Sequence, residues 1–179
     1  MKTQHFNIAG AGSTIEWVGK KVTGSHNGTI NIAGGELTLT DGKLTGGRFT
    51  IDTTSIKILD VKDPATNAQF AGHLASEDFF ATEKYPAASL EITSVSNGIN
   101  GIYHIAANLT IKGITQPIEF EATVDSVNGN TLQASGKLVI DRTKYNMKFR
   151  SGNFFKDLGD TLIYNDFALD VRLTANAAI

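Results

Sequence analysis

Cysteine is absent from the 179 residues, which excludes disulfides, zinc fingers, thiolate nucleophiles and iron–sulfur clusters. A surplus of one charge is also absent, because the formal net charge is −2. A general nucleic-acid binder would carry a basic excess, so no nucleic-acid partner is expected. No apolar run approaches the roughly 20 residues of a membrane span, so no stable membrane insertion is expected. The composition, 41% hydrophobic and 19% charged, is ordinary for one globular domain.

A signal peptide is not visible in the opening residues, MKTQHFNIAGAGSTIEW. They lack an apolar core of roughly 7–15 residues, which a secretory signal requires. As written, the sequence therefore predicts a cytoplasmic protein. The alternative is a periplasmic protein from which a signal was removed.

Catalytic and metal-binding motifs are scarce. The four histidines show neither the His-x-His nor the HExxH spacing of metal sites. No G-x-S-x-G nucleophile motif and no phosphate-binding glycine loop occurs. The paired carboxylates Glu77 and Asp78 have no evident apolar setting that would raise a pKa. We expect no metal, no cofactor and no catalytic residue, although a triad assembled only by folding stays open.

What the sequence does contain is alternation with period two, the signature of strands. Turn signals separate the alternating stretches, at Gly34–Gly35, Asp41–Gly42 and several Asn-Gly pairs. The pattern predicts eight or nine strands, mostly joined by hairpins, with one apolar and one polar face. This arrangement suits an antiparallel sheet wrapped around an apolar interior, and a two-sheet sandwich is the competing arrangement. Strands longer than the usual ~5–6 residues favour the barrel.

One stretch has helical character, from Pro64 to Ser76. Proline is suited to the first helical turn. Phe70, His73 and Leu74 then fall on one face at helical spacing. A second short helical turn is expected in NFFKDLGD, which begins at residue 153.

Small residues recur on the inward faces of the expected strands. The stretch KVTGSHNGTI alternates so that Gly24, His26 and Gly28 point inward. A small barrel with a filled interior would favour bulky residues there. The glycines therefore leave room either for a ligand or for a large neighbour such as Trp17.

Several motifs resemble the YceI-like family of bacterial lipid-binding proteins. They are, in order, WVGKKVTGSHNGTI, GKLTGGRFTIDTTSI, HLASEDFFATEKYPAASLEITSV, ANLTIKGITQPIEFEATV and LVIDRTKYN. The resemblance runs from about residue 15 to residue 173. It implies a mainly β fold: an extended eight-stranded antiparallel β-barrel, similar to lipocalins, with a short helix covering one end. Residues 13–175 would form this single domain, after an N-terminal extension of residues 1–12.

The resemblance also implies a function and a site. Family members bind long apolar lipids, such as polyisoprenoids, isoprenoid quinones or fatty-acyl chains, and homodimers are common. We expect non-catalytic binding or carriage of such a lipid in a tunnel; an enzyme acting on an apolar substrate, or a structural β-domain with a filled core, are the alternatives. The expected tunnel wall comprises Trp17, His26, Phe49, Ile51, Leu90, Ile92, Tyr103, Ile105, Leu138 and Ile140. The expected lid comprises Phe70, Leu74, Phe79 and Phe80. Arg142 is expected at the rim, where it would meet an anionic head group or form a salt bridge.

Overall fold

The structure, a computed structural model, describes residues 2–21, 24–97, 101–148 and 163–177. Within these ranges the chain forms nine strands, one α-helix and two short 3-10 helices. The strands are β1 (Thr3–Ile8), β2 (Thr14–Lys21), β3 (Gly24–Thr40), β4 (Lys43–Ile58), β5 (Ala87–Asn97), β6 (Ile102–Ile111), β7 (Ile114–Asn128), β8 (Thr131–Asp141) and β9 (Ile163–Ala177). The helices are η1 (Gly10–Gly12), α1 (Pro64–Ala75) and η2 (Arg142–Tyr145). The short helical turn expected at residues 153–160 lies outside the described residues.

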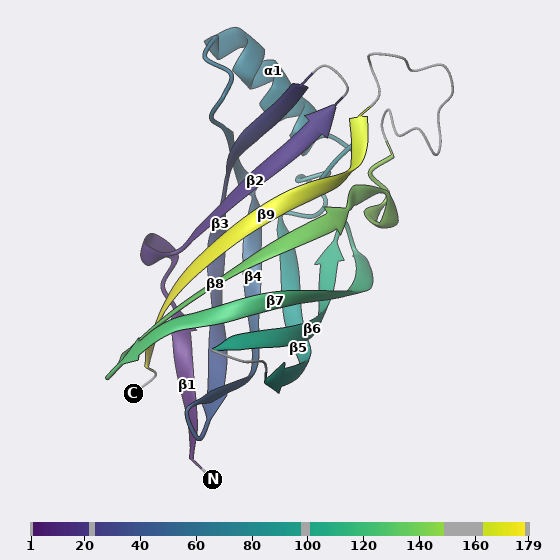
Figure 1. Ribbon diagram of the computed structural model, residues 1–179. Coiled ribbons are helices and arrows are strands. Elements are labelled where there is room, and N and C mark those ends of the chain that lie inside the picture. Colours follow the sequence, from purple (N-terminus) through teal and green to yellow (C-terminus); the bar gives the residue numbers. More distant parts are fainter. Residues whose placement is uncertain (1, 22–23, 98–100, 149–162, 178–179) are drawn as a thin grey trace.

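Eight of the strands close into an antiparallel barrel, as the sequence predicted. Neighbouring strands follow the order β3-β2-β9-β8-β7-β6-β5-β4, and the pairing of β4 with β3 completes the ring. Figure 1 shows the long strands crossing obliquely around a common interior. The longest, β3, has 17 residues, far above the usual ~5–6, in agreement with the long tilted strands of a barrel.

The ninth strand, β1, was not among the elements expected from the alternation. It pairs with β3 on one side and β9 on the other, so it continues the wall beyond the point where β2 begins. Phe6 is fully buried and Ile8 nearly so. Residues 3–8, expected to belong to an N-terminal extension, thus take part in the sheet.

One expected turn was wrong. Gly34 and Gly35 lie inside β3, opposite Thr50 and Phe49 of β4. A Cβ on Gly35 would lie only 2.5 Å from the Cβ of Phe49. Gly35 therefore allows close approach of two strands, and neither glycine reverses the chain. The turn expected at Asp41–Gly42 is confirmed, with φ angles of 51° and 81°.

The barrel interior differs between its two ends. The half that contains β1 is filled with buried side chains: Phe6, Leu37, Leu39, Leu44, Tyr103, Ile105, Leu132, Leu173 and Ala175. The other half lies beside α1, which Figure 1 shows at the opposite end of the molecule from the N-terminus. No helix among the described residues is long and apolar enough to cross a membrane.

Candidate functional site

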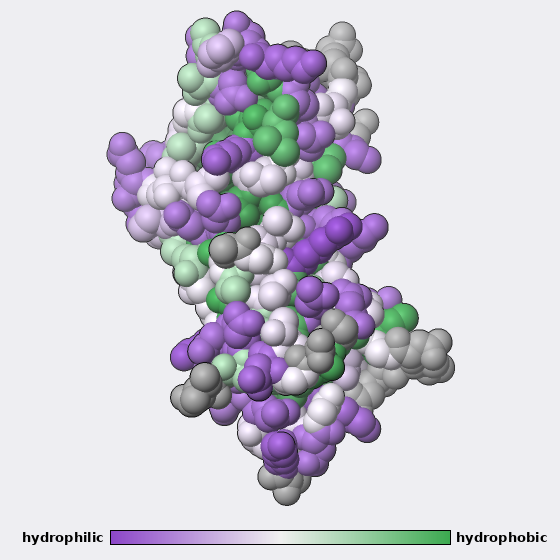
Figure 2. All heavy atoms as spheres, turned by 90° about the vertical axis from the view of Figure 1, so that its left-hand side faces the viewer, coloured by the Kyte–Doolittle hydropathy of each residue, from purple (hydrophilic) through white to green (hydrophobic). Residues whose placement is uncertain are grey.

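A cavity of about 670 Å³ occupies the α1 half of the barrel. This volume lies within the range of about 300–1,000 Å³ that is common for small-molecule sites. Strands β2, β3, β4, β5, β6 and β9 contribute its walls. Its apolar lining consists of Ile15, Trp17, Ile30, Ile51, Ile56, Val61, Phe70, Leu74, Phe79, Phe80, Ala88, Leu109, Ile111, Met147, Ile163, Phe167 and Leu169. In Figure 2, apolar side chains are visible between polar ones near the end of the molecule that carries α1.

Two local features of the sequence place helix α1 at the cavity: a capping residue before its first turn, and one helix face that points toward the barrel. Asp63 is the N-cap, and its carboxylate accepts hydrogen bonds from the backbone nitrogen and the hydroxyl of Thr66. These bonds hold the pKa of the Asp63 carboxyl below its ordinary value. The expected helical face is confirmed, because Phe70, His73 and Leu74 all line the cavity. No residue of α1 is fully buried, so its attachment to the barrel depends on a few specific contacts.

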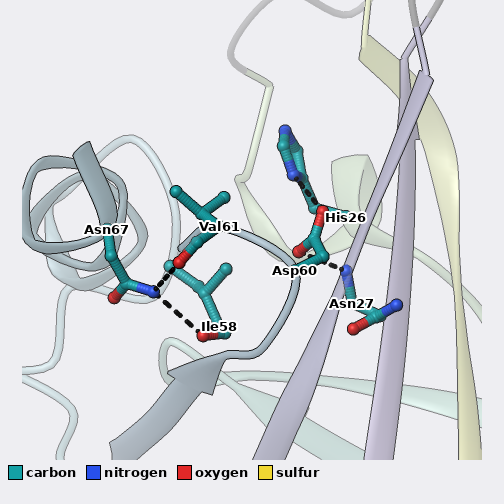
Figure 3. Close-up of polar contacts among 6 residues, drawn as sticks. All are labelled: His26, Asn27, Ile58, Asp60, Val61 and Asn67. Atoms are coloured by element: carbon teal, nitrogen blue, oxygen red, sulfur yellow. Dashed lines mark hydrogen bonds and ion pairs between the residues drawn. The ribbon is translucent and has the colours of Figure 1, made fainter. Parts of the chain in front are cut away.

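Asn67 makes two of those contacts. Its amide nitrogen donates to the carbonyl oxygens of Ile58, at 2.9 Å, and Val61, at 3.0 Å (Figure 3). Ile58 is the last residue of β4, and Val61 belongs to the segment that leads from β4 into the helix. Asn67 thereby fixes the helix to the end of a barrel strand.

The same segment is attached to β3 through Asp60. One carboxylate oxygen lies 2.8 Å from Nδ1 of His26, and the other accepts from the backbone nitrogen of Asn27 at 3.0 Å (Figure 3). The His26 ring also meets the edge of Phe70, with 4.6 Å between ring centroids. Burial raises the pKa of Asp60, but the hydrogen bonds from Asn27 and His26 outweigh it, and the net pKa lies below the ordinary value.

A second histidine–carboxylate pair follows α1. Nε2 of His73 lies 3.0 Å from the carboxylate of Asp78, and the His73 ring packs edge-on against Phe79. Ser76 ends the helix, donating its hydroxyl to the His73 carbonyl. The pair thus links the helix to the Phe79–Phe80 segment that lines the cavity.

Arg142 lies at the base of η2 and is only 4% exposed. Its two terminal nitrogens donate to the carbonyl oxygens of Met147, at 2.6 Å, and Ile163, at 3.0 Å. Its guanidinium also lies 5.8 Å from the centre of the Phe79 ring. Burial lowers the pKa of Arg142. Arg142 borders the cavity, but these bonds give it a structural role in joining η2 to β9; contact with a head group stays a prediction.

Two further polar groups are buried at this end of the barrel: Tyr145, which ends η2, and Lys112, which lies in the turn between β6 and β7. The Lys112 ammonium donates to the carbonyls of Glu77 and Asn146, and burial lowers its pKa. The Tyr145 hydroxyl has no hydrogen-bond partner among the residues that the structure describes, and burial raises its pKa to about 12. Lys112 therefore ties three loops together at the cavity end.

The expected site residues separate into two groups. Those that line the cavity are Trp17, His26, Ile51, Phe70, Leu74, Phe79, Phe80 and Arg142. The others are absent from its lining and belong to the hydrophobic core or pack against it: Phe49, Leu90, Ile92, Tyr103, Ile105, Leu138 and Ile140. Contact of either group with a ligand stays a prediction.

Sequence reasoning missed part of the lining. Ile15, Ile30 and Leu169 belong to inward rows that the alternation shows, but nothing in the alternation indicates which end of a row faces open space. The alternation gave little indication of Thr53, which is polar, or of Val61, which lies between β4 and α1. The hydroxyl of Thr53 donates to the Tyr85 carbonyl, which explains how a polar side chain is accommodated there.

The sequence left two explanations for the glycine at position 28: it makes room for a ligand, or it makes room for Trp17. A Cβ on Gly28 would lie 1.8 Å from the Lys57 carbonyl oxygen and 2.6 Å from the Trp17 ring. Trp17 itself donates its indole N–H to the Thr29 carbonyl at 3.3 Å. Gly28 therefore makes room for the tryptophan and for strand β4.

Comparison with known proteins gives a consistent family match. The model of the YceI-like domain matches residues 6–175. Protein YceI of Escherichia coli is 31% identical over 123 residues, which cover 69% of this chain and 59% of that protein. A UPF0312 protein of Shewanella denitrificans is 28% identical over 95 residues, covering 53% of this chain and 47% of its own length. The chain thus spans about half the length of the curated relatives it matches.

Solved structures share the fold. Burkholderia cenocepacia BcnA aligns with a TM-score of 0.76 at 23% identity, covering 94% of this chain and 99% of that chain. A domain from Saccharophagus degradans, described as polyisoprenoid binding, aligns with a TM-score of 0.69 at 14% identity. That alignment covers 97% of this chain and 98% of the other.

Proposed function

The chain belongs to the YceI-like domain family, and from that premise we propose that it binds a long apolar lipid in the cavity beside α1 without catalysing a reaction. The ligand classes that fit are a polyisoprenoid, an isoprenoid quinone or a fatty-acyl chain. The observation that carries the proposal is the predominantly apolar lining of a 670 Å³ cavity. The polyisoprenoid-binding description of the Saccharophagus degradans domain supports the same ligand class.

Apolar contact alone can supply the affinity. Each buried methylene contributes about 0.8 kcal/mol before the losses of association are subtracted. A chain of several isoprene units therefore needs few polar contacts, mainly at its head group. Homodimerisation, which the family resemblance implies, stays a prediction.

The polar groups at the cavity support binding over catalysis. The side chain of His26 pairs with the carboxylate of Asp60, and that of His73 pairs with the carboxylate of Asp78. Arg142 donates to backbone carbonyls. These contacts hold loops and α1 in place, so each group has a structural role.

The direct test is organic extraction of the purified protein followed by mass spectrometry. Ala88 lines the cavity, and its neighbour Ser89 faces solvent on the same strand. Ala88→Phe fills cavity space, whereas Ser89→Phe adds the same ring outside. We expect the wild type and Ser89→Phe to yield a long-chain lipid, and Ala88→Phe to yield severalfold less.

Two results would contradict the proposal. One is recovery of no lipid, combined with no uptake of added prenols, quinones or fatty acids. The other is equal lipid recovery from Ala88→Phe and Ser89→Phe, which would place the lipid outside the cavity.

A further inference from the structure

The cavity stops at a definite level inside the barrel, and strand register locates that level. Phe49 of β4 lies opposite Leu90 of β5, which in turn lies opposite Leu109 of β6. Ile51 and Ala88, one inward row nearer α1, are also opposite each other. Ile51, Ala88 and Leu109 line the cavity, but Phe49 and Leu90 do not. The open space therefore ends at the row formed by Phe49 and Leu90.

Beyond that row the interior is occupied by protein. Ala107, the next inward residue of β6, is 1% exposed, and Ile105 is 3% exposed. Farther along, β1 inserts Phe6, which is fully buried together with Leu132 of β8. The barrel is thus closed by its own side chains at the end opposite α1, and the cavity is a blind pocket.

The depth of this pocket limits the ligand. A water-sized group occupies roughly 30 Å³ in the liquid, so a 670 Å³ space holds about 20 groups of that size, such as methylenes. That corresponds to about four isoprene units or one acyl chain of similar size. A longer chain has to leave its excess outside the cavity.

Phe49 is held firmly at this level. Gly35 of β3 lies opposite it, so close that a Cβ there would lie 2.5 Å from the Cβ of Phe49. Leu90 lies opposite on the other side and is only 2% exposed. The phenyl ring fills space equal to six carbon atoms, about one isoprene unit, one row beyond the cavity-lining residues Ile51 and Ala88.

We propose that Phe49 and Leu90 form the floor that sets how much of a chain the cavity encloses, with a limit near 20 non-hydrogen atoms. The proposal rests on lipid binding in the cavity and adds a size limit to it. Phe49 and Leu90 are therefore specificity-determining residues that act at the buried end of the ligand.

The test is a chain-length series of all-trans prenols with three, four, five and six isoprene units, delivered from cyclodextrin. For the wild type, affinity should rise about tenfold per unit while the chain is still entering the cavity, and then level off near four units. In Phe49→Ala the rise should continue to five units. In the double variant Phe49→Ala/Leu90→Ala, the rise in affinity with chain length should continue beyond five units, or the gain in affinity from the fifth unit should be larger.

Leu132→Ala is the matched control, because it also removes buried side-chain atoms, but opposite Ala175 at the β1 end of the barrel. It should lose stability and keep the wild-type length limit. A limit that is unchanged in folded Phe49→Ala, or that shifts equally in Leu132→Ala, would overturn the floor assignment and leave lipid binding intact. If Phe49→Ala fails to fold, Phe49→Leu tests the same point with a smaller expected shift. Failure of the wild type to bind any prenol, acyl chain or quinone would instead refute the proposed function itself.

Discussion

The side chain of Asp60 connects two chain segments beside the cavity. Its carboxylate joins the segment before α1 to His26 and Asn27 of β3. Its pKa in the folded protein lies below the ordinary value of about 4. The resulting stabilisation is therefore fully present above about pH 4 and is lost as the pH falls through the lower, folded-state pKa.

Replacing Asp60 with Asn should lower the free energy of unfolding by about 1 kcal/mol at pH 7, a modest value because solvent screens this partly exposed pair. As the pH falls below about 4 and through the lowered pKa of Asp60, the difference from the wild type should shrink, because the wild-type carboxyl takes up a proton. Urea unfolding of both proteins at pH 7 and at a series of acidic pH values measures this. A gap of constant size across the series would show that the Asp60 charge does not contribute.

Gly28 allows a second prediction at the residue scale. In Gly28→Ala, the new Cβ would collide with the Lys57 carbonyl, so β3 and β4 must separate locally. We expect a loss of about 1–3 kcal/mol, typical of overpacking. Gly34→Ala on the same strand is the control, because a Cβ there meets nothing within 4 Å. Urea unfolding should rank Gly34→Ala as clearly more stable than Gly28→Ala; the reverse order would refute the steric explanation.

The sequence alone could not show which of these glycines is sterically constrained. The sequence marks Gly28 as inward-facing, but its contact with Lys57 depends on how β4 is shifted against β3. Likewise, His26 was expected as a wall residue without a named partner. Its partner, Asp60, is 34 positions away and reaches it only through the turn into α1.

At the scale of elements, α1 was predictable because its signals are local. Proline at the first turn and the spacing of Phe70, His73 and Leu74 depend only on neighbouring residues. Strand β1 was missed because a six-residue segment is too short to show a clear alternation of apolar and polar residues. It is stabilised by two partners, β3 and β9, that are distant in sequence.

The attachment of α1 gives a prediction at this scale. Asn67→Asp keeps the size of the side chain but removes the donor to the carbonyls of Ile58 and Val61. Faster amide hydrogen exchange is expected in α1, by about tenfold if about 1.4 kcal/mol is lost locally. Lys62→Ala, at an exposed position of the same segment, should leave exchange in α1 nearly unchanged. Equal exchange in Asn67→Asp and the wild type would mean that other contacts hold the helix.

At the scale of the whole molecule, ligand binding and folding are coupled. A ligand that binds only the folded barrel at a hundred times its Kd adds about 2.7 kcal/mol to the free energy of unfolding. For a chain of this size, Tm should then rise by roughly 5–10 °C. Thermal unfolding with and without geranylgeraniol measures the shift. No shift at saturation, when bound prenol is recovered by extraction, would indicate binding outside the folded interior.

By itself, the sequence determined antiparallel strands joined by hairpins and a helix from Pro64 to Ser76, because alternation, turn residues and helical spacing are local signals that each segment carries. The closed barrel, the helix at one end of it and the family came from the resemblance of its motifs to the YceI-like family. Only the tertiary structure decided where the interior is open. Phe49 and Ile51 have the same inward orientation and similar hydrophobicity, and no local pattern distinguishes them. Their different positions, at the floor and in the wall of the cavity, depend on how the side chains of eight strands, β1 and α1 fill one shared volume.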